Sequence, residues 1–513
     1  MASDKIPNVY GPGTFTDKTF TLVSEDTQRI FRLIIGQTSG FTQDECLLSK
    51  VKFTGEEYPV IPGPIKTVSV AASLHAMTGV LADEILAIRG VKNDKRQITV
   101  NTTHTAIWFG CIATAFLDGV DVISLTRQGK LKGLLPDWEQ GWTDTALKYR
   151  TTGLYPTNNP DVWYSLHGSM NAEPVLRSIG VDPLTLIKSN DEAAAHIARH
   201  TIRLSPEKME MTNLLNGLCG SIYQTVPTPP VAFPSLNPND KRPLSGVKVI
   251  EMIRVIADPE FGTILVAYGK RTIAIDLRNK KDEGLLKSLV SECDVFIQGF
   301  RLNKMPKFGL GLDDLLKMAG ERGRGIVHVS ENCYGPDGYY AERPGWQQIA
   351  DAASGSAYAV LPSLPISDMS TGVLGAVGAM LGLKRRAVEG GSYYSHASLT
   401  GVNAYALTEG VGLYLQSVVD DCKKRFQWGE MRGAHHVLDL LVTVWNGWKQ
   451  VLSDYLDPEG EWFRSFNGSS FDNKTLTILR PVDRFEGESE STPHWKTPSV
   501  PYAHEKAESV RFM

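Results

Sequence analysis

The chain has 513 residues, of which 42% are hydrophobic and 21% are charged, and its net charge is −4. This length favours two domains over one, and the composition supplies ample apolar side chains for buried cores. The slight acidic excess argues against a nucleic-acid-binding protein, because such proteins usually carry a marked basic excess.

The cysteines and the chain ends bear on the compartment. Six cysteines are scattered, and no two form a CxxC pair, so we expect a reduced intracellular compartment and no metal site. Residues 1–13 lack the apolar core of a signal peptide, the apolar run 106–116 is too short to span a bilayer, and the C-terminal VRFM is not a peroxisomal signal of the SKL type. These features predict a cytoplasmic protein that does not contact a membrane. Peroxisomal and mitochondrial locations stay open.

A linker divides the chain. Residues 226–243, VPTPPVAFPSLNPNDKRP, are rich in proline, asparagine and serine and show no helical or strand period. Proline disfavours helix in the residue before it, so this segment is expected to be extended. We predict a domain boundary near residue 235.

After the linker, short apolar runs alternate with helical spacing. A helix is predicted over 282–292. Strands are predicted at 247–252, 272–277, 294–297 and 325–330. This alternation favours an α/β fold with a doubly wound parallel sheet, in which ligands bind at the carboxyl ends of the strands. Polar, basic or aromatic residues follow three of these strands: Arg254, Phe300, Arg301 and the segment 332–338.

Asp368 marks the start of the next predicted helix, which runs to about Arg386. Ser367 and Asp368 are both good N-cap residues. Four glycines follow at spacings of three and four: Gly372, Gly375, Gly378 and Gly382. Glycine is unfavourable inside a helix, so this stripe indicates that something approaches the backbone closely. Tight helix packing explains it more simply than direct ligand contact.

The chain also contains an internal similarity. Residues 79–89, GVLADEILAIR, parallel residues 375–385, GAVGAMLGLKR, and each segment precedes a polar stretch and a short strand-like run. In this register Asp368 falls on Ala72, so the first copy lacks the carboxylate.

Five segments, in order, resemble the CaiB/BaiF pattern of the family III CoA-transferases. They are PLSGVKVIE from 243, KRTIAIDLR from 270, DVFIQGFR from 294 with the following FGL, YGPDG from 334 with RPGW and ASG, and DMSTG from 368. The resemblance covers residues 243 to about 400. It implies a Rossmann-like, doubly wound domain with a smaller α+β domain.

Residues 66–226 resemble the later part of a family member, and NPDVWYSLH at 159–167 looks like one of its strands. The chain therefore reads as an imperfect, fungal-like tandem. Residues 1–235 would be a truncated copy without the nucleophile, and residues 236–513 the copy that carries Asp368. Members of this family form interlocked homodimers, so the resemblance allows either an intramolecular pseudo-dimer or a homodimer.

The resemblance implies that Asp368 is the nucleophile that attacks the thioester of an acyl-CoA. It further implies a mixed anhydride, then an enzyme aspartyl-CoA thioester, and then transfer of CoA to an incoming carboxylic acid. CoA would be a substrate, with no tightly bound cofactor. A helix N-terminus suits this role, because its free N–H groups keep a desolvated carboxylate ionised. The plainer interpretation of the local sequence is an ordinary capping aspartate.

The same segments supply candidates for holding CoA: Lys270, Arg271, Arg301 and Lys307 for its phosphates, and Phe300 as an apolar wall. Taken singly, each basic residue is more simply a solvated surface charge, and only its place in segments that resemble the family's CoA-contacting segments makes the two interpretations equal.

Trp346 is a further candidate at the CoA site, and it separates two chemistries. Racemases of this fold place a histidine at the matching position, and two-base racemisation needs a proton donor on each face of the carbanion. An indole cannot fill that role, which favours transfer over racemisation. A core position for Trp346, or a shift of the match by a residue or two, remains open.

One departure bears on activity. The segment 260–269 is much shorter than its counterpart in the family, where a strand and an arginine-bearing loop help to hold CoA. Three hypotheses follow: an acyl-CoA transferase, with a role in secondary metabolism suggested by resemblance to fungal tandem proteins; a 2-methylacyl-CoA racemase or epimerase; and a catalytically degenerate CoA-binding homologue.

Overall fold

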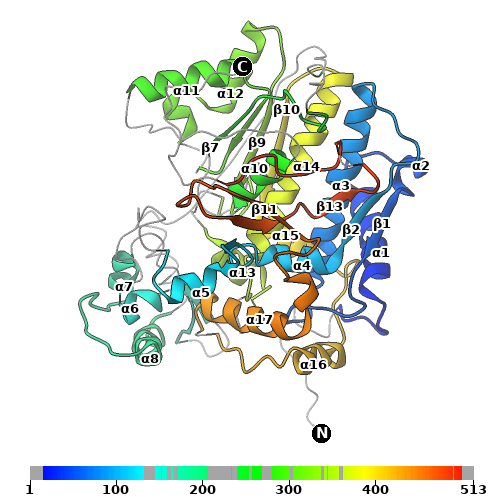
Figure 1. Cartoon of the computed structure of the whole chain (residues 1–513). Coiled ribbons are helices and arrows are strands. Elements are labelled where there is room, and N and C mark those ends of the chain that lie inside the picture. The colour runs from blue at the N-terminus through cyan, green and yellow to red at the C-terminus, as the bar shows by residue number, and fades with distance from the viewer. Residues whose placement is uncertain are drawn as a thin grey trace.

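The structure is a computed structural model (Figure 1). It describes residues 15–131, 145–151, 153–158, 163–166, 172–205, 209, 233, 240–252, 257–267, 280–300, 304–336, 340–341, 343, 345–357, 362–433, 435–488 and 490–499. Several predicted features lie outside these residues: most of the linker, the predicted strand 272–277, and the candidate residues Lys270, Arg271 and Arg301.

A four-stranded sheet in the order β10-β9-β8-β7 forms the centre of the second half. Every neighbouring pair in it is parallel. The strands are β7 (Val249–Met252), β8 (Val295–Gln298), β9 (Val327–Asn332) and β10 (Tyr393–Ser398). The first three confirm predicted strands to within about two residues, because each begins with a valine and carries a second β-branched residue, which suits a buried strand. The mixed α/β class with a parallel sheet is thereby confirmed.

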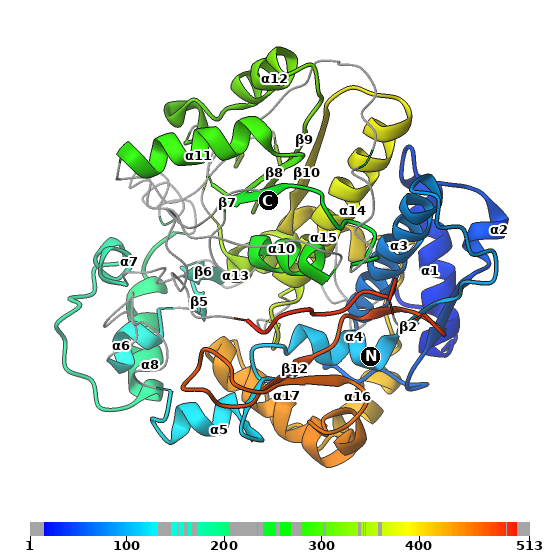
Figure 2. The ribbon, with the colours of Figure 1, turned by 45° about the horizontal axis from the view of Figure 1, so that its top comes forward.

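Helices cover both faces of this sheet, as Figure 2 shows. Since successive side chains of a strand point to opposite faces, Val295, Ile297 and Val327 share one apolar cluster with α14 (Ile366–Val388) and α10 (Ala257–Ala267). Alternate residues such as Ile250 and Phe296 pack instead with α11 (Lys280–Glu292) and α12 (Leu312–Glu321).

The N-terminal half repeats part of this order. The elements β1 (Val51–Thr54), α3 (Thr67–Ile88), β2 (Ile98–Asn101) and α4 (Thr102–Phe109) follow one another as β9, α14, β10 and α15 (Leu399–Ala406) do, except that α13 (Gln347–Ser354) stands between β9 and α14. In both cases the two strands pair in parallel. The helices that carry the internal similarity, α3 and α14, pack directly against each other (Figure 1).

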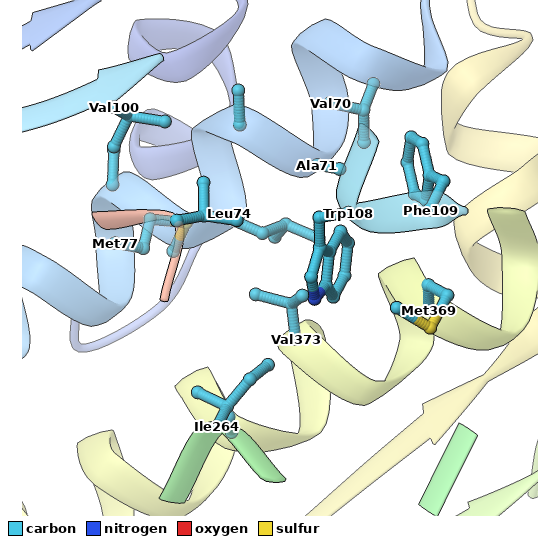
Figure 3. Packing of buried hydrophobic residues seen from close by; sticks show 14 of the residues in the cluster. Val70, Ala71, Leu74, Met77, Val100, Trp108, Phe109, Ile264, Met369 and Val373 are labelled. Atoms are coloured by element: carbon cyan, nitrogen blue, oxygen red, sulfur yellow. The ribbon is translucent and has the colours of Figure 1, made fainter. Parts of the chain in front are cut away.

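One core runs through both halves. Side chains of α3, α4, α10 and α14 belong to the same buried cluster, and Figure 3 shows Trp108 of α4 among residues of α3, α10 and α14. The boundary predicted near residue 235 stays a prediction, but residues on its two sides do not form separate cores.

The C-terminal strands return to the N-terminal half. The strand β13 (Asp483–Phe485) pairs antiparallel with β2, and β12 (Leu476–Leu479) joins β11 (Phe463–Phe466) to β3 (Phe116–Leu117) and β4 (Val120–Asp121). The end of the chain therefore completes sheets that its beginning starts.

The remaining elements surround this centre. A small lobe holds α6 (Ala146–Tyr149), β5 (Gly153–Pro156), β6 (Trp163–Leu166), α7 (Glu173–Ser178) and α8 (Asn190–Thr201) around a cluster of its own. The others are α1 (Val23–Gln37), α2 (Glu45–Leu48), α5 (Val122–Arg127), η1 (Met305–Phe308), α13 (Gln347–Ser354), α16 (Gln416–Arg425), α17 (Val437–Val451) and η2 (Ser453–Tyr455). By length and composition α3 and α14 could each cross a membrane, but most of each helix is buried inside the protein.

Candidate functional site

Asp368 lies in the first turn of α14 and is its only acidic residue there. The helix begins at Ile366, two residues before Asp368, and its N-cap is Pro365. The prediction that Ser367 or Asp368 caps the helix is therefore wrong in detail, because the fixed backbone angle of Pro365 already suits the turn into the helix. The predicted placement at a helix N-terminus is confirmed, and the side chain is buried, with 9% of its surface exposed.

The sheet and the helix together place Asp368 at the carboxyl ends of the strands. Gly382, near the end of α14, lies against Tyr393 and Val327, which begin β10 and β9. One turn earlier, Gly378 lies against Ser395 in the middle of β10. The helix thus runs antiparallel to the strands, and its first turn lies where parallel α/β sheets bind ligands.

These contacts also explain the glycine stripe. A Cβ atom on Gly378 would lie 2.9 Å from Cβ of Ser395, and one on Gly382 would lie 2.8 Å from Cγ1 of Val327. Both distances are too short for real side chains, so glycine is required for the helix to approach the sheet. The interpretation as tight helix packing is confirmed at these two positions.

Two short helices flank the start of α14. The Nε2 of Gln347, on α13, donates to the carbonyl oxygen of Leu364 over 2.7 Å and so anchors the segment that leads into the helix. The backbone N–H of Thr400, on α15, donates to the carbonyl oxygen of Cys333 just beyond β9. Both helices therefore hold the loops around Asp368 in place.

A second buried carboxyl group lies between these helices. Asp351 of α13 is 1% exposed and accepts a hydrogen bond from Ser367, the residue that precedes Asp368. Burial raises its pKa to about 6, although hydrogen bonds from Asn403 and Ser367 act in the opposite direction. We did not single out Asp351 from the sequence, where its only signal is an acidic residue in the small apolar run Ala350–Ala353.

The candidate CoA contacts are only partly placed. Phe300 follows β8 and packs against the apolar cluster beneath α11 and α12, while Lys307 is exposed on η1. Trp346 is partly buried at the N-cap of α13, five residues before Asp351. Trp346 thus lies at the start of the helix whose Asp351 bonds the residue before Asp368. Phe300, in contrast, contacts the cluster on the other face of the sheet. Lys270, Arg271 and Arg301 lie outside the described residues.

The two histidines nearest in sequence to the site do not fill the position of a second proton donor. His328 is fully enclosed beside the rings of Phe296 and Tyr394, and burial lowers its pKa to about 3. His396 contacts Ser330 at 2.7 Å and Asn332 at 3.0 Å. Because strand residues alternate, both histidines lie on the face opposite α14.

The corresponding helix of the first half carries no such site. The first turn of α3 contains no acidic residue, and Ala72 is fully buried in the core. Counted from the helix start, the partner of Asp368 would be Ser69, which accepts a hydrogen bond from Thr27 over 2.8 Å. In neither register does a carboxylate of the first half stand at the position that corresponds to Asp368. In the part of the chain that the structure describes, no cluster of histidine, cysteine or acidic residues could hold a metal ion.

Some known proteins are similar to part of the chain, and others to nearly all of it. Residues 264–417 match CoA-transferase family III. An acyl-CoA transferase of Gibberella moniliformis is 36% identical, over 98% of each chain. An acetyl-coenzyme A transferase of Hypoxylon pulicicidum is 26% identical over 86% of this chain and 85% of that protein. The succinyl-CoA:glutarate CoA-transferase of Mus musculus is 24% identical, covering 39% of this chain and 54% of its own length.

Among solved structures, a CAIB/BAIF family protein from Brucella suis shares 22% identity over 33% of this chain and 56% of that chain, with a TM-score of 0.29. The near full-length similarity to the Gibberella protein and the family match over the site establish the relationship. The chain is a CoA-transferase and belongs to CoA-transferase family III.

Proposed function

We propose that this enzyme moves CoA between an acyl-CoA donor and a carboxylic acid, with Asp368 as the nucleophile. One observation carries the assignment: a buried carboxyl group in the first turn of α14, at the carboxyl end of the parallel sheet. The helix N-terminus favours the ionised form, and burial removes the water that would weaken a carboxylate nucleophile.

The reaction would proceed through two exchanges at this carboxylate. An oxygen of Asp368 attacks the thioester carbonyl of the donor, the C–S bond breaks, and the CoA thiolate leaves a mixed anhydride. The thiolate then attacks the aspartyl carbonyl, which releases the donor acid and gives an aspartyl-CoA thioester. The acceptor carboxylate attacks that thioester, and the same steps in reverse transfer CoA to the acceptor and restore Asp368.

The relatives suggest which substrates to test first. The names of the similar proteins point to acetyl-CoA and succinyl-CoA as donors and to glutarate as an acceptor. Two of the similar proteins come from fungi, and we propose by this likeness that the enzyme acts in secondary metabolism. We also propose that it works in the cytoplasm.

We also propose that the chain is a tandem in which residues 1–235 act as the partner of residues 236–513. The repeated order of β1, α3, β2 and α4, the contact between α3 and α14, and the return of β13 to β2 all support an intramolecular pseudo-dimer. A homodimer of such chains is the alternative, which sedimentation of the purified protein would distinguish by mass.

The experiment compares the wild type with Asp368→Ala. Each is incubated with a donor acyl-CoA and a free acid, followed by hydroxylamine, which converts an aspartyl thioester to a hydroxamate. We expect CoA exchange and labelling of Asp368 only in the wild type. Equal inertness of both proteins would favour a degenerate CoA-binding homologue. Exchange of an α-proton with deuterated water, without transfer, would favour a racemase.

A further inference from the structure

Asp351 lies where three helices meet beside the start of α14. Its Oδ1 accepts hydrogen bonds from Oγ of Ser367 over 2.9 Å and from Nδ2 of Asn403 over 2.8 Å. A longer contact, 3.4 Å, comes from Oγ of Ser356. Oδ1 of Asp351, on α13, thus accepts hydrogen bonds from α14, from α15 and from the turn that follows α13.

The bond to Ser367 replaces an ordinary helix cap. In α4 and α15 the N-cap side chains of Asn101 and Ser398 accept a backbone N–H and so fix the first turn. The start of α14 has no side-chain cap, and Pro365 has no side-chain acceptor to provide one. The side chain of Ser367, the second residue of the helix, is tied instead to Asp351. The orientation of the turn that carries Asp368 therefore depends on that carboxyl group.

A buried carboxyl group is a costly way to join helices. Asp351 is 1% exposed, and its Oδ2 has no hydrogen-bond partner among the described residues. Transferring such a group from water to the interior is unfavourable, and a neutral side chain that accepts the same bonds would avoid that cost. This carboxyl group accepts a hydrogen bond from Ser367, the residue that precedes the nucleophile in the chain.

We infer that Asp351 is a positioning residue for transfer. It holds Ser367, and through Ser367 it fixes the direction from which the Asp368 carboxylate meets the thioester. This inference rests on the proposed role of Asp368. Asp351 itself forms no bond with the substrate and gains no covalent intermediate.

Variants of Ser367, which donates the hydrogen bond to Asp351, test this role with the least change to the core. Ser367→Ala removes the bond to Asp351, and Ser367→Thr keeps a hydroxyl group at the same place. Ser69→Ala is the matched control, because Ser69 is equally buried in the first turn of α3 and also takes part in a hydrogen bond. Asp351→Leu removes the acceptor, whereas Asp351→Asn keeps an amide oxygen that can accept the same bonds. The measurements are kcat and KM for CoA exchange, the rate of hydroxamate formation at Asp368, and the melting temperature.

We expect Ser367→Ala to lower kcat and the labelling rate by about 10- to 100-fold, since small misplacements of a reacting group cost rates of this order. KM should stay within about twofold, because the substrate contacts are unchanged. Ser367→Thr and Asp351→Asn, which both keep the bond, should recover most of the activity, Asp351→Leu should resemble Ser367→Ala, and Ser69→Ala should react like the wild type.

Two results would overturn the inference, and they differ. If the wild type labels Asp368 but Ser367→Ala and Asp351→Leu do so at the same rate, with only a lower melting temperature, Asp351 is a purely structural residue. If the wild type itself gives no label and no exchange, the proposed role of Asp368 fails and the positioning role fails with it.

Discussion

The indole Nε1 of Trp108 donates a hydrogen bond to Oε1 of Glu260 over 2.9 Å, and both side chains are buried. This bond joins α4 of the N-terminal half to α10, which packs along α14. Burial raises the pKa of Glu260 to about 8, and the nearby Glu251 acts in the same direction, so Glu260 is mostly uncharged at neutral pH. The contact between the two halves therefore contains a titratable group.

This contact predicts a loss of stability at alkaline pH. A carboxyl group whose pKa is higher in the folded than in the unfolded protein stabilises the fold fully below its unfolded pKa, and that stability is lost as the pH rises toward the folded value. The free energy of unfolding should fall by a few kcal/mol between about pH 5 and pH 8, at ~1.4 kcal/mol per unit of pKa difference. Glu260→Gln should remove this dependence.

Urea unfolding across this pH range checks the prediction. The control is Glu292→Gln, whose side chain is largely exposed beside Lys248 and should leave the alkaline slope unchanged. Parallel stability curves for the wild type and Glu260→Gln would show that Glu260 is not the responsible group.

The close approach of α14 to the sheet predicts opposite effects of two glycine substitutions. Gly378→Ala places a methyl group against Ser395 and should destabilise the protein by about 1–3 kcal/mol. Gly284→Ala, on exposed α11, meets no atom within 4 Å and should stabilise it by about 0.5–1 kcal/mol, because alanine loses less conformational freedom. Thermal unfolding of both variants checks the pair. A neutral Gly378→Ala would mean that the helix does not approach β10 as described.

A buried ion cluster supports the start of α3. The Nζ of Lys66 lies 2.5 Å from Oδ2 of Asp26 and 2.5 Å from Oδ2 of Asp17, and Lys66 is 1% exposed. Lys66→Met leaves the buried Asp26 with one cation fewer and should cost about 3–5 kcal/mol, which denaturant unfolding measures. The matched variant Lys424→Met breaks an exposed pair with Asp421 and should cost under about 0.5 kcal/mol. Equal losses of unfolding free energy in the two variants would contradict the claim that burial makes the Lys66 pair more important than the exposed pair.

Local sequence patterns account for the features that were predicted correctly. Apolar runs that contain β-branched residues predicted β7, β8 and β9, and the polar segment before a glycine-bearing apolar stretch predicted a helix N-terminus beside Asp368. Each of these signals lies within a window of a few residues, where backbone preference and burial period act directly.

The contacts that hold the site together leave no such pattern. Asp351 and Ser367 belong to different helices, Trp108 and Glu260 to different halves, and β13 reaches β2 from the far end of the chain. Periodicity and propensity describe one element at a time, so they could not pair these residues. The internal similarity of 79–89 and 375–385 came closest, since it identified the two helices that meet in the core.

Mapping the hydroxamate after reaction with an acyl-CoA and hydroxylamine tests the role of Asp368 most directly. Asp368→Asn keeps the shape of the side chain but removes the nucleophilic carboxylate. Asp313→Asn is the control, because Asp313 is also an acidic residue in the first turn of a helix, exposed on α12. The account predicts a label on Asp368 in the wild type and in Asp313→Asn, and neither label nor CoA exchange in Asp368→Asn. CoA exchange by Asp368→Asn at the wild-type rate would contradict it.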